Sequence, residues 1–174
     1  RHIEWLMEKY ENIQTIDIDL TNVFYEFKST VEKNSSTNEL ALANTRSRIR
    51  MMTLYYHATI NNSIVVGTGN KVEDFGIGFY TKYGDGGVDI SPIADLMKSE
   101  IFEISKELKI NKEILEAKPT DGLWDDGRTD EDQIGASYDD LERVMNSLEN
   151  GVSPEKFDDK TREDFNIYIK HHNA

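Results

Sequence analysis

SIVVGTGN, at residues 63–70, places a short apolar run of β-branched residues directly before two glycines. Such a run is typical of a strand in a parallel sheet that is covered on both faces. The strand would end at Gly67, and a helical pattern resumes after Asn70. Because parallel sheets bind their ligands beyond the carboxyl ends of the strands, this stretch also predicts a site around Thr68.

Strand and helix patterns alternate on both sides of this stretch. Residues 14–20 alternate isoleucine or leucine with aspartate, which predicts a second strand. Ser91 followed by Pro92 predicts the start of a helix whose apolar stripe runs from Met97 to Leu108. Further helical patterns cover about 2–10, 22–33, 38–59, 111–117, 137–148 and 161–171. The alternation predicts an α/β fold with a parallel sheet.

Charge and length limit the function classes. The 174 residues match one ordinary domain, and 33 acidic against 20 basic residues give a net charge of −13. This charge argues against binding to the phosphate backbone of a nucleic acid. Residues 121–164, an acidic helical region, hold 15 acidic and 5 basic residues. Such a run is typical of a solvated surface, with a cationic small-molecule partner as the alternative.

Missing residue types and patterns exclude other classes. The chain contains no cysteine, so it has no disulfide, thiolate zinc site or cysteine nucleophile. No apolar run approaches the ~18 residues of a membrane span, and the first residues show no apolar stretch of a signal peptide. We therefore expect a soluble cytoplasmic protein without a membrane or nucleic-acid partner.

Three residues between 65 and 98 suit phosphate chemistry, and each has a structural alternative. Thr68 could donate to a phosphate or cap the next turn. Glu73 could offer a carboxylate to Mg²⁺, or form a capping box with Asn70. Lys98 could reach a phosphate, or extend along the apolar stripe of its own helix to solvent.

A glycine-rich segment and three arginines are further candidates. Five glycines lie between Gly76 and Gly87, which is typical of backbone that approaches a ligand closely or of a plain surface loop. Arg46, Arg48 and Arg50 follow one another at every second position of a helical pattern. An arginine on a partly buried helix face needs an anionic or carbonyl partner, which a ligand or an internal salt bridge could provide. The four histidines show no metal-ligand spacing.

Six motifs occur in a fixed order along the chain. They are NTRSRIRM (44–51), GTGNKVE (67–73), FYTKYGDGGVD (79–89), PIADLMK (92–98), AKPTDGLW (117–124) and DEDQIGASY (130–138). In order and spacing, the region of about 40–145 resembles the ammonia-dependent NAD synthetases. The resemblance implies an adenine nucleotide α-hydrolase-like, Rossmann-like fold, which is a three-layer sandwich around a parallel sheet.

The resemblance also implies a reaction. It is a ligase reaction that converts deamido-NAD, ATP and ammonia to NAD, AMP and pyrophosphate through an acyl-adenylate, the last step of NAD biosynthesis. Mg²⁺ would accompany ATP, and the implied assembly is a homodimer. The alternatives are a non-catalytic nucleotide-binding or dimerisation remnant of the same fold, and a related ATP pyrophosphatase that acts on another carboxylate or carbonyl.

Individual roles follow from the same resemblance. The ATP contacts would be Thr68, Lys98 and Thr120, of which Lys98 and Thr68 would be catalytic. The Mg²⁺ carboxylate would be Glu73. The deamido-NAD contacts would be Arg48, Lys82 and Asp89. Residues 78–89 are expected to be mobile without ligand and to become ordered over deamido-NAD.

The chain departs from the family pattern in three places. The SGGxDS phosphate loop of the family is missing and would lie upstream of Arg1. The segment after Glu73 is one residue longer than in many members, and the His-Lys pair found near the carboxyl end of the family does not occur. We therefore expect residues 1–174 to be a single NAD synthetase domain that lacks its N-terminal strand and phosphate loop. Alone, such a part of a longer polypeptide would be inactive.

Overall fold

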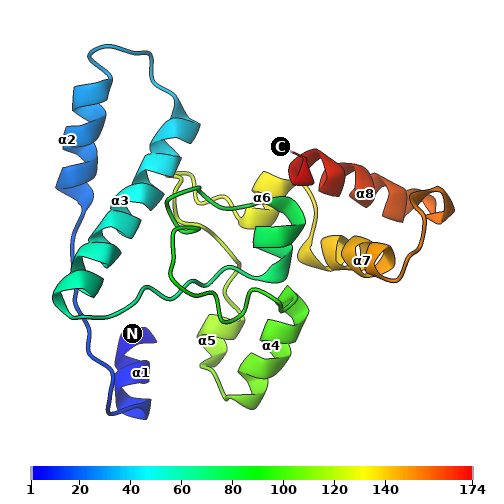
Figure 1. Cartoon of the computed structure of the whole chain (residues 1–174), viewed down its shortest axis with the longest axis horizontal. Helices are drawn as coiled ribbons and strands as arrows, with labels where there is room; N and C mark the ends of the chain where they lie inside the picture. Colours follow the sequence, from blue (N-terminus) through cyan, green and yellow to red (C-terminus); the bar gives the residue numbers. More distant parts are fainter. Residues whose placement is uncertain (1, 174) are drawn as a thin grey trace.

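Helical segments joined by loops make up residues 2–173, which are the residues that this computed structural model describes (Figure 1). The first are α1 (His2–Lys9), α2 (Thr21–Val31), α3 (Glu39–Ile60) and the π-helix η1 (Lys71–Ile77). They are followed by α4 (Lys98–Glu107), α5 (Lys112–Leu115), α6 (Asp130–Ile134), α7 (Tyr138–Glu149), the 3₁₀ turn η2 (Pro154–Lys156) and α8 (Asp159–His172). None of the helices over residues 2–173 is long and apolar enough to cross a bilayer.

The six helices predicted from periodicity alone are present, each within two residues of the predicted ends. Four of them, α3, α5, α7 and α8, have first turns that are capped by polar side chains. Asn38 accepts a hydrogen bond from Ala41 N, and Asp158 accepts one from Thr161 N. These caps satisfy backbone donors that have no partner within the helix, which is why the helices begin where they do.

The strand predicted over 14–20 is wrong, and residues 2–173 contain no extended ladder. Alternation identifies a chain with two different faces, but a strand also needs a partner for its backbone, and no described segment pairs with 14–20. Residues 63–66 form a single parallel bridge, between Val66 and Ile90. Gly67 N donates to Ile90 O at 2.8 Å, and Asp89 N donates to Val65 O at 2.9 Å. The parallel direction is therefore present locally, while the predicted sandwich is not seen in the described residues.

The helix predicted to begin at Ser91 instead begins at Lys98. Residues 92–95 form a turn, and Ala94 N donates to Ser91 O at 3.2 Å. The carbonyl of Leu96 is used by a distant partner, because it accepts a hydrogen bond from Lys71 N at 2.9 Å. This contact joins the start of η1 to the start of α4.

The main core lies where α7 and α8 pack on each other and on η1 (Figure 1). Val72 and Ile77 contribute η1's buried face, and Leu141 and Val144 contribute that of α7. A smaller apolar cluster joins α2 to α3 through Phe24, Leu42 and Ile49.

The acidic region 121–164 contributes to this core as well as to the surface. Its carboxylates Glu142 and Asp164 are buried and paired. Glu142 accepts hydrogen bonds from the backbone and hydroxyl of Ser99, and Asp164 pairs with Arg143. The region is therefore not only a solvated surface.

Replacing Leu141 with alanine should lower the free energy of unfolding by about 2–5 kcal/mol. Leu141 is 0% exposed, so the shorter side chain leaves a cavity between α7, α8 and η1. Urea unfolding measures the change, and Leu108→Ala is the matched control because the Leu108 side chain is 56% exposed. Equal effects of the two substitutions would contradict the assignment of this core.

Candidate functional site

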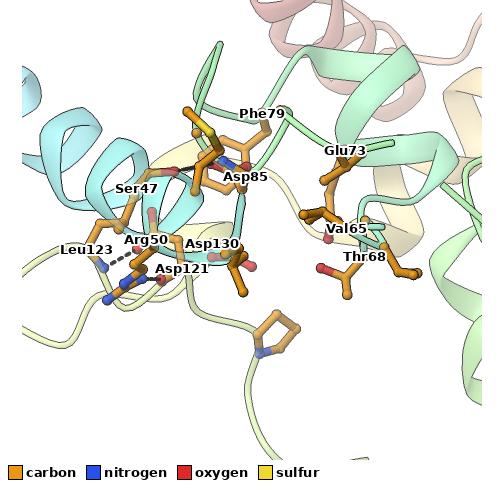
Figure 2. A pocket seen from close by; sticks show the side chains of 18 of the residues that line it. Ser47, Arg50, Val65, Thr68, Glu73, Phe79, Asp85, Asp121, Leu123 and Asp130 are labelled. Carbon is orange, nitrogen blue, oxygen red and sulfur yellow. Dashed lines mark hydrogen bonds between the residues drawn. The ribbon is translucent and has the colours of Figure 1, made fainter. Parts of the chain in front are cut away.

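A cavity of about 510 Å³ opens between α3, η1, the start of α4 and the loops around residues 66, 85 and 121. Figure 2 shows Thr68 and Glu73 on one side of it and Arg50 and Asp121 on the other. Four of the seven residues to which the sequence assigns a role line this cavity: Thr68, Glu73, Lys98 and Thr120. The other three, Arg48, Lys82 and Asp89, do not.

The turn into η1 positions Glu73. The Asn70 side chain accepts hydrogen bonds from Val72 N and Glu73 N, so Asn70 is the predicted cap of this helix. The reciprocal half of a capping box is not formed, because the Glu73 carboxylate instead contacts Lys98 and Tyr138.

A charged cluster at the cavity wall joins four elements. Glu73 Oε1 accepts hydrogen bonds from Lys98 Nζ at 2.7 Å and from the Tyr138 hydroxyl at 2.7 Å. The same hydroxyl lies 3.3 Å from Asp130 Oδ2, and the Lys98 ammonium lies 4.7 Å from the centre of the Tyr138 ring. Lys98 and Glu73 are 20% and 15% exposed, so this ion pair is screened far less than a surface pair.

Burial controls the protonation of this cluster. Burial raises the pKa of Tyr138, and the Glu73 carboxylate raises it further. The phenol therefore stays protonated and donates a hydrogen bond to Glu73. Burial also raises the pKa of Asp130, although the hydrogen bond from Tyr138 lowers it in part. Within residues 2–173, Asp130 Oδ1 is buried without a hydrogen-bond partner. The cluster thus holds two acidic side chains, Glu73 and Asp130, beside one ammonium group, that of Lys98.

Thr68 and Thr120 approach the cavity from different loops. The Thr68 side chain lies on the exposed wall directly after the parallel bridge. The Thr120 hydroxyl donates to Arg128 O at 3.1 Å and accepts from Gly122 N at 3.3 Å. Thr120 therefore also shapes its own loop.

The three residues outside the cavity wall make structural contacts. Asp89 Oδ2 accepts from Val65 N at 2.7 Å, and Oδ1 accepts from the Tyr55 hydroxyl at 3.1 Å. Asp89 thereby satisfies a backbone donor that a neighbouring strand would otherwise satisfy. Arg48 Nε donates to Lys82 O at 3.1 Å, which joins α3 to the glycine-rich segment.

Two arginines of α3 fix the loop that carries Thr120. Arg46 Nη1 donates to Leu123 O at 2.6 Å, and Arg50 contacts the carbonyl oxygens of Asp121 and Gly122 at 3.3 and 3.0 Å. Arg46 also pairs with Asp125, so the internal salt bridge considered from the sequence is present for this arginine.

Side chains of α3 hold the glycine-rich segment. The Ser47 hydroxyl donates to Asp85 Oδ1 at 2.6 Å and accepts from Asp85 N at 2.9 Å, and Thr81 N donates to the same carboxylate oxygen at 3.1 Å. Gly84 lies against Ser47 so closely that an added Cβ would meet its hydroxyl at 2.2 Å. A glycine is required there because of this close approach.

We expect Ser47→Ala to loosen this segment selectively. The substitution removes the hydroxyl that bonds both the carboxylate and the N–H of Asp85, and the loss of one such hydrogen bond costs about 0.5–1.5 kcal/mol. Hydrogen exchange of residues 80–88 should become faster than in the unchanged protein. Thr53→Ala is the control, because the Thr53 hydroxyl bonds only the carbonyl of Ile49 in its own helix. Unchanged exchange in Ser47→Ala would show that this contact does not hold the segment.

Sequence reasoning assigned no role to Tyr138, Asp130 or Ser47. Tyr138 and Asp130 both lie in the motif DEDQIGASY, which was recognised by its place in the order of motifs, but neither residue was given a function. Ser47 lies in the middle of a helical pattern, where a serine carries no signal of its own. Its hydrogen bond with Asp85, 38 positions later, forms only in the folded chain.

Comparison with known proteins gives a consistent result. The model of the NAD synthase family matches residues 2–170. The chain is 41% identical over 158 residues to the NH(3)-dependent NAD(+) synthetase of Methanosarcina mazei, covering 91% of this chain and 59% of that protein. It is 44% identical over 131 residues to the synthetase of the same name from Thermoplasma volcanium, covering 75% and 52%. The chain thus spans little more than half the length of these relatives.

Solved structures agree with the sequence comparison. The NMN synthetase of Francisella tularensis has a TM-score of 0.78 at 34% identity, over 98% of this chain and 64% of that one. The NH3-dependent NAD synthetase of Campylobacter jejuni has a TM-score of 0.64 at 27% identity, over 88% and 59%.

Proposed function

The chain belongs to the NAD synthase family, and we propose that it forms the larger part of the active site of an ammonia-dependent NAD synthetase. The proposed reaction converts deamido-NAD, ATP and ammonia to NAD, AMP and pyrophosphate. The observation that carries the proposal is the cavity wall at which Thr68, Glu73, Lys98 and Thr120 meet, although they lie up to 52 positions apart in the sequence.

In the first step, the carboxylate oxygen of the nicotinate forms a bond to the α-phosphorus of ATP while the bond to the leaving pyrophosphate breaks. Negative charge accumulates on the phosphate oxygens as this happens. The Lys98 ammonium and the hydroxyls of Thr68 and Thr120 are donors of the kind that stabilise such charge. Their action is greatest in the transition state, where the charge is largest.

In the second step, ammonia attacks the acyl carbon of the adenylate. The new carbon–nitrogen bond replaces the carbon–oxygen bond to AMP, and the nitrogen loses a proton as the amide forms. No side-chain nucleophile takes part, which agrees with a chain that has no cysteine.

The donor set at Glu73 fits Mg²⁺, which would lower the negative charge of the ATP phosphates when bound. Mg²⁺ prefers oxygen ligands and is commonly held by one or two carboxylates together with substrate phosphates. In the described residues no group of three acidic or histidine side chains is arranged for a metal, so phosphate oxygens would have to complete the site. The buried and unpartnered Asp130 Oδ1 supports the proposal that this wall accepts a cation.

The Glu73–Lys98 ion pair gives this wall a way to accept both charges of a metal–nucleotide complex. Each member of the pair neutralises the other at 2.7 Å. When Mg²⁺ and ATP bind together, Glu73 would exchange the ammonium for the metal, and Lys98 would exchange the carboxylate for a phosphate. This exchange leaves neither buried charge unpaired, which is the condition for placing charges in a partly desolvated site.

Arg48, Lys82 and Asp89 remain our proposed deamido-NAD contacts. Arg48 and Lys82 are exposed cations, joined through the Lys82 carbonyl. Both Asp89 oxygens already accept hydrogen bonds, so Asp89 would contribute by holding Val65 in place as well as by any ligand contact.

We also propose the remaining family features for this chain. A three-layer sandwich is supported by the parallel bridge at Val66 and by the structural neighbours. A homodimer is supported by large apolar side chains on α3 that are more than half exposed, namely Leu40, Met52, Leu54, Tyr56 and Ile60. The proposed compartment is the cytoplasm. A chain without cysteine forms no disulfide that would need an oxidising compartment.

A second candidate is amide formation on the mononucleotide. It is favoured by the 0.78 TM-score of a neighbour named an NMN synthetase. The two substrates share the nicotinate carboxylate and differ in whether an adenylyl group is attached. One assay can therefore compare them directly.

The proposal is tested with the whole protein, ATP, Mg²⁺ and ammonium, and with either deamido-NAD or nicotinate mononucleotide. We expect NAD and AMP in equal amounts from deamido-NAD. Preferred use of the mononucleotide would favour the second candidate. Nucleotide binding without amide formation on either acid would instead indicate a non-catalytic remnant.

A further inference from the structure

Tyr138 contacts Glu73 and Lys98 but has no role in the reaction proposed above. It is the first residue of α7, it is 5% exposed, and it packs in the core with Val72 and Ile134. Its backbone N–H donates to Glu131 Oε1 at 3.0 Å. Both the main chain and the ring of Tyr138 are therefore held in place.

The hydroxyl and the ring of Tyr138 contact charged groups from three other elements. Its hydroxyl donates to Glu73 Oε1 at 2.7 Å and lies 3.3 Å from Asp130 Oδ2. Its ring lies beneath the Lys98 ammonium at 4.7 Å, within the range of a cation–π contact. One rigid side chain thus touches the proposed metal carboxylate and the proposed phosphate cation at the same time.

The hydroxyl uses one particular oxygen of Glu73. Tyr138 and Lys98 both bond Oε1, and neither uses Oε2. If Lys98 moves to a phosphate, the hydrogen bond from Tyr138 still fixes the carboxylate. A tyrosine that stays on Glu73 therefore preserves the orientation of the site during the exchange of partners.

We propose that Tyr138 is a positioning residue for amide formation, whose hydroxyl orients Glu73 and whose ring supports Lys98. The proposal rests on the proposed function of this site. Partners of this kind around a metal ligand typically change metal affinity or activity 10–100-fold when they are removed. Tyr138 would act through Glu73 and Lys98, and not on the substrate itself.

Tyr138→Phe tests the hydroxyl and keeps the ring. We expect the Mg²⁺ concentration for half-maximal activity to rise about tenfold, and KM for ammonia to stay within twofold. Mn²⁺-dependent binding of ATP, measured by calorimetry without turnover, should weaken by a similar factor. Tyr138→Leu also removes the ring and should lower kcat further than Tyr138→Phe.

Tyr168→Phe is the matched control. Tyr168 belongs to the same core cluster and is 8% exposed, and its hydroxyl has only a 3.4 Å contact with His172. Urea unfolding of both variants reports any loss of packing. If Tyr138→Phe and Tyr168→Phe have the same Mg²⁺ dependence and the same Mn²⁺–ATP affinity, the positioning role is wrong.

A double-mutant cycle separates positioning from general stability. In a Glu73→Gln background, Tyr138→Phe should reduce activity and Mn²⁺–ATP affinity by less than twofold, because its target is already altered. Fully additive losses would overturn the proposal. A protein that makes no amide in any variant would refute the proposed function, while the calorimetric comparison would still decide the role of Tyr138.

Discussion

Lys98→Ala should lower kcat for NAD formation about 10²-fold or more, with a much smaller effect on the binding of deamido-NAD. Lys98 is the first residue of α4 and the cation of the cavity wall that is paired with Glu73. The ammonium would act on charge that develops on phosphate oxygens, so its loss should appear mainly in the rate of the first chemical step. Alanine also leaves Glu73 without its ion pair, which adds an unpaired, largely buried carboxylate to the ground state.

Pre-steady-state release of pyrophosphate measures that first step directly. Lys106→Ala is the control, because Lys106 lies in the last turn of the same helix and its side chain is exposed. The control should keep a pyrophosphate burst close to that of the unchanged protein. An undiminished burst in Lys98→Ala would remove Lys98 from the reaction.

Glu73→Gln should lower kcat/KM for Mg²⁺–ATP about 100-fold and shift the Mg²⁺ requirement to higher concentrations. The substitution keeps the shape of the side chain and an oxygen that can accept hydrogen bonds from Lys98 and Tyr138. It removes the negative charge that a metal would meet. The structure of η1 should therefore persist while the affinity for the cation falls.

Initial rates over a range of Mg²⁺ concentrations, at saturating deamido-NAD and ammonium, measure this shift. Glu149→Gln provides a matched control, since Glu149 forms the other carboxylate–lysine pair of η1, with Lys71 at 2.6 Å. The Glu149 side chain is half exposed and lies outside the cavity wall. An identical Mg²⁺ dependence in the two variants would argue that Glu73 holds no metal.

The helices could be predicted from the sequence because apolar periodicity and caps are local properties. The helix over 38–59 was predicted from its own periodicity, and the structure adds that Asn38, its neighbour in sequence, caps it. The strand expected at 14–20 and the helix start expected at Ser91 failed for the opposite reason. Pairing of a strand and use of the Leu96 carbonyl by Lys71 both depend on segments far away in sequence.

The site was partly predictable for a different reason. Thr68, Glu73, Lys98 and Thr120 were predicted as site residues from ordered motifs, and the structure brings them to one cavity. The roles of Arg46, Arg50 and Ser47 could not be found in this way. Their partners are backbone carbonyls or a loop carboxylate, and only the folded chain brings these near α3.

The family resemblance predicts that the segment after Glu73 is one residue longer than in many NAD synthetases, and the wide turn of η1 would accommodate such a residue. Gly78 N donates to Glu73 O, five positions back, as in a π-helix and unlike an α-helix. An extra residue in an α-helix would rotate everything that follows it around the helix axis. A π turn accommodates an extra residue by widening one turn of the helix. Val72 and Ile77 can therefore both face the core while Glu73 contacts Lys98. A gap in an alignment of this family at this position would then correspond to a widened helical turn, and a lineage could gain or lose the residue without reorienting the Glu73 carboxylate.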